Sequence, residues 1–97
     1  MNDKFYGMLG LAQRAGAVCS GAVQCQQALK KGKASLIILA EDASDEVREE
    51  YQFLGGKNKI PVITVPSKAV LGSVIGKSPR VAVVITEQNF SRRLQEL

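Results

Sequence analysis

Apolar residues recur every three or four positions in five segments of this chain, a spacing that predicts amphipathic helices. The segments are residues 4–15, 22–31, 44–54, 67–75 and 87–97. Four short runs between them are rich in Leu, Ile, Val and Ala and predict β-strands. These runs are residues 17–20, 35–40, 60–65 and 81–86. The run 35–40, SLIILA, is almost entirely apolar, which is typical of a strand covered on both faces.

Serine and glycine residues mark the ends of the predicted helices. Ser44 and Ser67 stand where helical segments begin, and each side chain can accept a hydrogen bond from a backbone N–H of the first turn. Gly76 closes the fourth helical segment, and the pair Gly55-Gly56 predicts the end of the third.

Buried strands that alternate with amphipathic helices predict an α/β protein. We expect a three-layer α/β/α sandwich around a four-stranded mixed sheet. The chain is 97 residues long, and no linker or internal repeat interrupts the alternation. A domain of this size has little room for an enclosed substrate cavity. We therefore expect residues 1–97 to form a single domain.

The charges divide the chain into an acidic segment and a basic remainder. Thirteen Lys and Arg stand against nine Asp and Glu, a net charge of +4. Residues 41–50 hold six of the nine acids and one Arg, so this window carries −5 and the rest of the chain +9. Basic surfaces attract polyanions, of which nucleic acid is the usual candidate. Charge alone leaves a second interpretation open, an acidic helix in solvent beside ordinary surface lysines.

Missing residue types argue against several classes of function. The chain has no His, which removes the commonest general base and metal ligand. Cys19 and Cys25 are spaced as C-x5-C with no further Cys to complete a metal site, and we expect reduced thiols. The longest fully apolar run, residues 36–40, is far shorter than the roughly 20 residues that span a membrane. We therefore expect a cytoplasmic protein that is not an enzyme, uses no cofactor or metal and contacts no membrane.

Two glycine-containing segments resemble nucleotide-binding loops but have the wrong spacing. Residues 72–78, GSVIGKS, place three residues between the glycines where the phosphate loop has four. Pro79 and a predicted strand follow, whereas a phosphate loop leads into a helix. Residues 10–16, GLAQRAG, do not match G-x-G-x-x-G and lie within and after a predicted helix. Nucleotide hydrolysis and dinucleotide binding are therefore both disfavoured.

The helical segment that begins after Gly21 is the most informative stretch for binding. A helix that starts at glycine leaves its first backbone N–H groups open to a polyanion. Gln24 and Gln27 add side-chain amides on one face, which can donate to and accept from base edges. Lys31 shares this polar face. An ordinary amphipathic helix with a polar outer face fits the same spacing and, on spacing alone, is the simpler interpretation.

Several blocks of sequence, taken in order, resemble one known family. They are residues 10–16 (GLAQRAG), 21, 31–44 (KGKASLIILAEDAS), 67–72 (SKAVLG) and 75–77 (IGK). These blocks resemble the L7Ae/L30e superfamily of ribosomal proteins over essentially the whole chain, and its short bacterial members in particular. The resemblance implies an α/β/α sandwich that binds a kink-turn, a sharply bent helix–bulge–helix RNA built on sheared G·A pairs.

The resemblance also implies a set of RNA-contacting residues. In the family, the pattern G-x-[NK]-[EQ]-x-x-K at the start of the second helix meets the G·A pairs. Here the pattern falls on Gly21, Ala22, Val23, Gln24 and Gln27. Val23 stands where the family has a polar residue, and Gln27 stands where it has lysine. The loop after the second strand, the lysine that opens the fourth helix and the loop before the last strand are further implied contacts. Together with the basic end of the second helix, these segments add six residues to the set of expected RNA contacts: Lys31, Glu41, Asp42, Lys68, Lys77 and Arg80.

We therefore expect a non-catalytic, ribosome-associated protein that binds a kink-turn or similar structured RNA, such as ribosomal RNA. The cations Lys68, Lys77 and Arg80 would contact phosphates, and Gln24 and Gln27 would contact bases. The alternative is a protein-interaction module, since members of the superfamily also bind proteins on the same fold. The apolar side chain at position 23 and the uncharged one at position 27 would suit that alternative.

Overall fold

The computed structural model describes residues 3–97, and its elements follow the predicted order. The helices are α1 (Asp3–Arg14), α2 (Ala22–Lys30), α3 (Asp45–Asn58), α4 (Lys68–Val74) and α5 (Gln88–Glu96). The strands are β1 (Val18–Ser20), β2 (Leu36–Ala40), β3 (Val62–Val65) and β4 (Ala82–Ile85). All predicted ends lie within two residues of the observed ends, except the end of α3.

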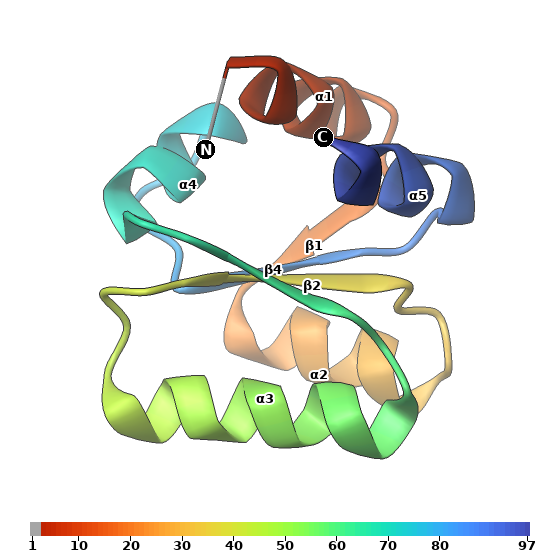
Figure 1. Ribbon diagram of the computed structural model, residues 1–97, viewed down its shortest axis with the longest axis vertical. Coiled ribbons are helices and arrows are strands. Elements are labelled where there is room, and N and C mark those ends of the chain that lie inside the picture. The colour runs from red at the N-terminus through yellow and green to blue at the C-terminus, as the bar shows by residue number, and fades with distance from the viewer. Residues whose placement is uncertain (1–2) are drawn as a thin grey trace.

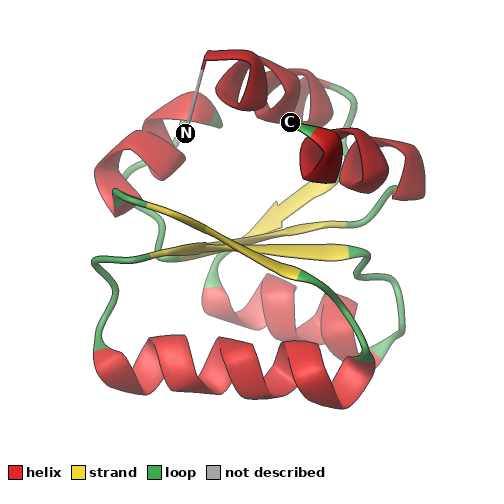
Figure 2. Ribbon diagram, in the orientation of Figure 1, coloured by secondary structure: helices red, strands yellow, loops and turns green. Residues whose placement is uncertain are grey.

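The sheet lies between two layers of helices (Figures 1 and 2). Its strand order is β1-β4-β2-β3, in which β4 is antiparallel to both neighbours and β2 is parallel to β3. Helices α1, α4 and α5 cover one face, and α2 and α3 cover the other (Figure 2). The predicted three-layer α/β/α sandwich with a four-stranded mixed sheet is confirmed.

Two hydrophobic clusters, one on each face of the sheet, hold the layers together. Strand β2 is buried at every position and contributes to both. Ile38 packs with Leu94 of α5 on one face, while Ile37 and Leu39 pack with Leu29 of α2 on the other. Each such side chain contributes about 1.5–3 kcal/mol when it leaves water. The prediction that this strand is covered on both faces is confirmed.

Helix α3 is longer than predicted because Gly55 and Gly56 lie inside it. The prediction that this pair ends the helix is wrong: α3 continues to Asn58, and Lys59 closes it in the left-handed conformation, with φ 57°. Gly55 serves packing instead. A Cβ at this position would lie 2.6 Å from Cγ2 of Val62, so only glycine lets the end of α3 approach β3 this closely.

The predicted serine caps are confirmed, and they fix where α3 and α4 begin. Ser44 Oγ accepts a hydrogen bond from the N–H of Val47, and Ser67 Oγ accepts one from the N–H of Val70, both at 3.2 Å. Gly76, with φ 72°, follows α4 as predicted. Residues 77–80 then lead into β4, so this glycine-containing segment does not open a helix as a phosphate loop does.

The two cysteines are free thiols on the side of the sheet that α2 and α3 cover. Cys25 is buried, and its Sγ donates to the carbonyl oxygen of Cys19 at 3.6 Å. Burial raises the pKa of the Cys25 thiol to about 11, so this thiol is neutral at physiological pH.

Within residues 3–97, no group of three or more His, Cys, Asp or Glu side chains could hold a metal ion. No helix in this range has the length and apolar character needed to cross a membrane.

Candidate nucleic-acid interface

The strand directions bring four connecting segments together at one end of the sheet. Strands β1, β2 and β3 run the same way, and β4 runs against them, so three carboxyl ends meet the amino end of β4. The N–H of Ala40 donates to the carbonyl oxygen of Val81 at 2.8 Å, and the N–H of Glu41 donates to that of Val65 at 2.7 Å. We call this end the loop end; it lies at the left of Figure 1, where α4 begins.

Lys68 connects two of these segments through its backbone. Asp42 Oδ1 accepts a hydrogen bond from the N–H of Lys68 at 2.9 Å. The carbonyl oxygen of Lys68 accepts one from the N–H of Arg80 at 3.0 Å. Glu41 accepts a bond from the Thr64 hydroxyl at 3.4 Å. The two carboxylates therefore order the loop after β2, and the exposed side chain of Lys68 is left for a ligand.

Arg80 connects the loop before β4 to the end of β1. Its Nε donates to Ser20 Oγ at 3.4 Å, and its Nη1 donates to Ser78 Oγ at 2.7 Å. Ser20 directly precedes Gly21, so the half-buried guanidinium lies beside the start of α2. A cavity of about 220 Å³ lies between this start, the loop and α3. Its lining is Gly21, Ala22, Gln26, Val47, Glu50, Tyr51, Pro79, Arg80, Val81 and Ala82.

The start of α2 is open to a ligand. Gly21 takes φ 90° and ψ 145°, no side chain among residues 3–97 caps the helix, and its first turn holds no acidic residue. Ala22, Val23 and Gln24 are all exposed, Val23 to 69%. The first N–H groups of a helix carry partial positive charge, and an anion placed there is stabilised.

Lys31 lies apart from the loop end, at the other end of α2. The helix has nine residues and is about 13 Å long at 1.5 Å per residue. Gln24, Gln27, Lys31 and Lys33 line a groove of about 280 Å³ together with residues of the sheet edge. The expectation that Gln24, Gln27 and Lys31 share one polar face is confirmed. The candidate residues therefore form two adjoining groups, the loop end and this α2 groove, which meet at the start of α2.

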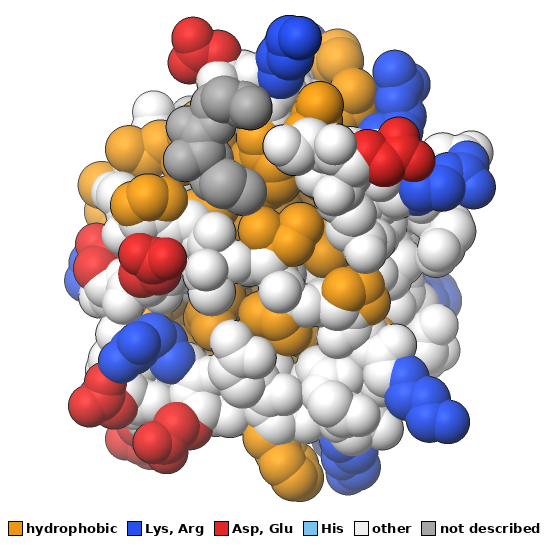
Figure 3. All heavy atoms as spheres, viewed as in Figure 1, with side chains coloured by type: hydrophobic (Ala, Val, Ile, Leu, Met, Phe, Trp, Pro, Cys, Tyr) orange, Lys and Arg blue, Asp and Glu red, His pale blue; other side chains and the backbone are white. Residues whose placement is uncertain are grey.

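Lysines line the α2 groove, and the loop end holds both cations and the carboxylates of Glu41 and Asp42, whereas the first turn of α3 is acidic. Acidic side chains gather at the lower left of the face in Figure 3, over the first turns of α3. Across residues 3–97, the only ion pair joins Arg48 and Asp45, both of α3. The lysines of the loop end and the α2 groove thus have no acidic partner within residues 3–97, and they can pair with an external anion. These lysines are Lys31, Lys33, Lys68 and Lys77.

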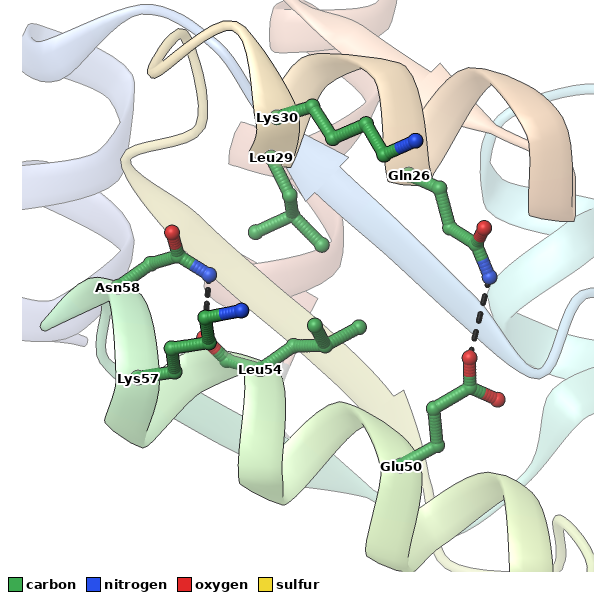
Figure 4. A pocket seen from close by; sticks show the side chains of 7 residues that line it. All are labelled: Gln26, Leu29, Lys30, Glu50, Leu54, Lys57 and Asn58. Atoms are coloured by element: carbon green, nitrogen blue, oxygen red, sulfur yellow. Dashed lines mark hydrogen bonds between the residues drawn. The ribbon is translucent and has the colours of Figure 1, made fainter.

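A further hollow of about 380 Å³ lies between α2 and α3 (Figure 4). Leu29 and Leu54 lie between the helices there, and Gln26 Nε2 donates to Glu50 Oε1 at 3.0 Å. None of the candidate residues lines it.

Sequence reasoning missed Ser20, and it included the loop 77–80 without assigning a role to Ser78. Each hydroxyl accepts a hydrogen bond from the Arg80 guanidinium. Ser78 stands two residues before Arg80, close enough for local contact to be anticipated. Ser20 is sixty residues away, and only the pairing of β1 with β4 brings it near.

Comparison with known proteins gives consistent matches over almost the whole chain. Residues 3–95 match the ribosomal protein L7Ae/L30e/S12e/Gadd45 family. The chain is 37% identical over 94 residues to the RNA-binding protein YlxQ of Bacillus subtilis, covering 97% of this chain and 94% of that protein. It is 28% identical over 95 residues to the RNA-binding protein YlxQ of Enterococcus faecium, covering 98% and 91%.

Solved structures agree with the fold. A protein of unknown function from Bacillus halodurans superposes with a TM-score of 0.92 at 34% identity, over 98% of this chain and 96% of that one. A 15.5 kD RNA-binding protein of Giardia lamblia superposes with a TM-score of 0.81 at 21% identity, over 97% and 87%. The second likeness concerns the fold alone.

Proposed function

We propose, from the premise that this chain belongs to the ribosomal protein L7Ae/L30e/S12e/Gadd45 family, that it is a non-catalytic RNA-binding protein. It acts as a single domain in the cytoplasm and recognises a kink-turn or a similarly bent RNA, in or near the ribosome. The RNA contacts the loop end and the open start of α2.

One observation carries this proposal most strongly. Asp42, Lys68, Arg80 and Ser20, from four separate segments, are joined by a continuous series of hydrogen bonds that ends beside the uncapped start of α2. A ligand at this end therefore meets free N–H groups, the Lys68 ammonium and the Arg80 guanidinium together. Phosphate oxygens are the natural partners of all three.

The two kinds of contact have separate consequences for recognition. Lys68 reaches phosphates, which are the same in every RNA, whereas the Gln24 amide can read a base edge. Lys68→Ala should weaken binding to a kink-turn and to a variant with disrupted G·A pairs by the same factor. Gln24→Ala should weaken binding to the kink-turn about tenfold and change binding to the disrupted RNA little.

A titration of wild type and both variants against the two RNAs, repeated between about 50 and 200 mM salt, tests the proposal. The wild-type affinity should fall steeply with salt, and Lys68→Ala should reduce the slope by about one. Affinity that does not change with salt, or equal losses for both variants on both RNAs, contradicts it.

The protein-interaction alternative has one observation in its favour. Val23 is exposed to 69% at the start of α2, where an apolar side chain cannot hydrogen-bond a base. This alternative would be favoured if the wild type bound a protein and no RNA, and if Val23→Asn abolished the binding of that protein.

A further inference from the structure

The loop before β4 is held by a close backbone contact with α4. A Cβ at Gly72 would lie 2.1 Å from the carbonyl oxygen of Ser78 and 2.9 Å from Cα of Pro79. The N–H of Lys77 donates to the carbonyl oxygen of Gly72 at 2.8 Å. No larger residue fits at position 72 without moving the loop, so α4 determines where Ser78 lies.

Within this loop, the guanidinium of Arg80 is fixed by several acceptors. Nη1 donates to Ser78 Oγ at 2.7 Å, to the Ser78 carbonyl oxygen at 3.2 Å and to the Pro79 carbonyl oxygen at 3.3 Å. Nε donates to Ser20 Oγ at 3.4 Å. A long arginine side chain loses considerable rotamer entropy when it is ordered, and these bonds meet that cost before any ligand arrives.

The remaining guanidinium nitrogen, Nη2, is left for a ligand. Within residues 3–97 Nη2 makes no hydrogen bond, and no carboxylate pairs with Arg80. The side chain borders the cavity that Gly21 and Ala22 also line. A nitrogen held at this place is ready to donate to an RNA phosphate or base edge near the start of α2.

We propose that Ser78 is a positioning residue for RNA recognition: its hydroxyl, supported by the Gly72 contact and by Ser20, holds the Arg80 guanidinium in its binding orientation. This inference rests on the proposed RNA-binding function. Arg80 is the residue that touches RNA, and Ser78 acts only through it.

A double-mutant cycle on the full chain tests the proposal, with a synthetic kink-turn RNA at fixed salt as the probe. Arg80→Ala should weaken binding roughly tenfold or more, and Ser78→Ala about fivefold. In the Arg80→Ala background, Ser78→Ala should have an effect of less than about twofold. Arg80→Lys should lose nearly as much as Arg80→Ala, since an ammonium cannot bridge the same acceptors. Ser73→Ala, at an exposed position of α4, is the matched control and should bind as wild type.

A second readout in the free protein keeps the inference separate from the proposed function. The Nε–Hε signal of Arg80 in an NMR spectrum should be sharp in wild type and in Ser73→Ala. In Ser78→Ala it should shift and broaden as the guanidinium becomes mobile. Equal losses from Ser78→Ala with and without Arg80, or an unchanged Arg80 signal, overturn the positioning role. A wild type that binds no kink-turn contradicts the proposed function, and the NMR signal then decides the positioning of Arg80 by itself.

Discussion

Two helices that cover the same face of the sheet begin in opposite ways. Helix α3 begins at Ser44, whose Oγ accepts a hydrogen bond from the first turn, and Asp45 and Glu46 add negative charge there. Helix α2 begins at Gly21, its first turn holds no acidic residue, and no side chain in the described part of the chain caps it. The start of α3 is therefore complete without a ligand, whereas the start of α2 keeps its N–H groups available to an anion. In α2 the N–H groups themselves are open to a ligand, whereas α4, whose first turn Ser67 caps, presents the Lys68 side chain instead.

The charged side chains around the two helix starts also differ, with cations near the start of α2 and acids at the start of α3. Arg80, held by Ser20 and Ser78, lies beside the start of α2, and the groove along this helix has Lys31 and Lys33 at its far end. The acids of the first turn of α3, Asp45 and Glu46, lie on another part of the surface (Figure 3), and Glu50 lines the far side of the cavity beside Arg80. The uneven distribution of charge along the chain thus places basic residues around α2, the helix proposed to bind RNA, and acidic residues on the solvent-exposed surface of α3.

The largest effect should come from making the start of α2 resemble that of α3. Ala22→Asp places a carboxylate in the first turn of α2, where it satisfies the N–H groups and repels phosphate. Affinity for a kink-turn RNA should fall about 100-fold, while the free energy of unfolding stays equal or rises by about 0.3–1 kcal/mol. RNA titration and urea unfolding measure the two quantities. The neutral variant Ala22→Asn is the control, and affinity retained by Ala22→Asp would show that RNA does not use this helix start.

An intermediate effect concerns the interior that the two helices share, where Cys25 of α2 and Tyr51 of α3 are both buried. Burial raises the pKa of Cys25 from 9.0 to about 11, and burial also raises the pKa of Tyr51. The neutral thiol is thus favoured in the folded state. Its contribution to stability is full below pH 9 and is lost as the pH rises from 9 to 11.

Urea unfolding at several pH values checks whether stability falls as the pH rises. The free energy of unfolding should fall by roughly 2 kcal/mol from Cys25 alone by pH 11, with a further fall above pH 10 from Tyr51. Cys25→Ala should remove the part of the decline between pH 9 and 10, and Cys19→Ala should leave it in place. A wild-type free energy of unfolding that is constant from pH 8 to 11 would contradict the burial of Cys25 and Tyr51 between α2 and α3.

The smallest effect should come from opening the start of α3. Ser44→Ala removes the hydroxyl that accepts the N–H of Val47, and the free energy of unfolding should fall by about 1 kcal/mol. RNA affinity should stay within about twofold, because no candidate contact lies on α3. Ser67→Ala makes the same change at α4, next to Lys68, and should reduce both stability and RNA affinity. Equal RNA losses from the two serine variants would remove the distinction between the helices.

Much of the architecture could be predicted because periodicity and caps are local properties of the chain. The alternation of helices and strands, the doubly covered β2 and the caps at Ser44 and Ser67 all follow from neighbours a few residues apart. The role of Gly55 could not, because glycine ends a helix in one context and allows close packing in another. Only the approach of Val62 of β3 distinguishes the two.

The segments that form the candidate site could be predicted from the sequence, but the contacts between these segments could not. The resemblance to the family implied contacts on α2, at the start of α4 and in two loops. The strand directions bring both loops and the starts of α2 and α4 to one end of the sheet. The contact of Arg80 with Ser20 spans sixty residues and depends on the register between β1 and β4. The separation of Lys31 from the loop end depends on the length of α2. Neither is visible in the spacing of residues.

The central claim, that RNA binds the loop end and the open start of α2, is tested most directly by mapping backbone amide signals during an NMR titration with a kink-turn RNA. We expect the largest shifts at residues 21–24, at Lys68 and at residues 77–80, with residues 52–58 of α3 unchanged. Shifts confined to the hollow between α2 and α3, around Lys30 and Lys57, with residues 21–24 unchanged, would contradict it.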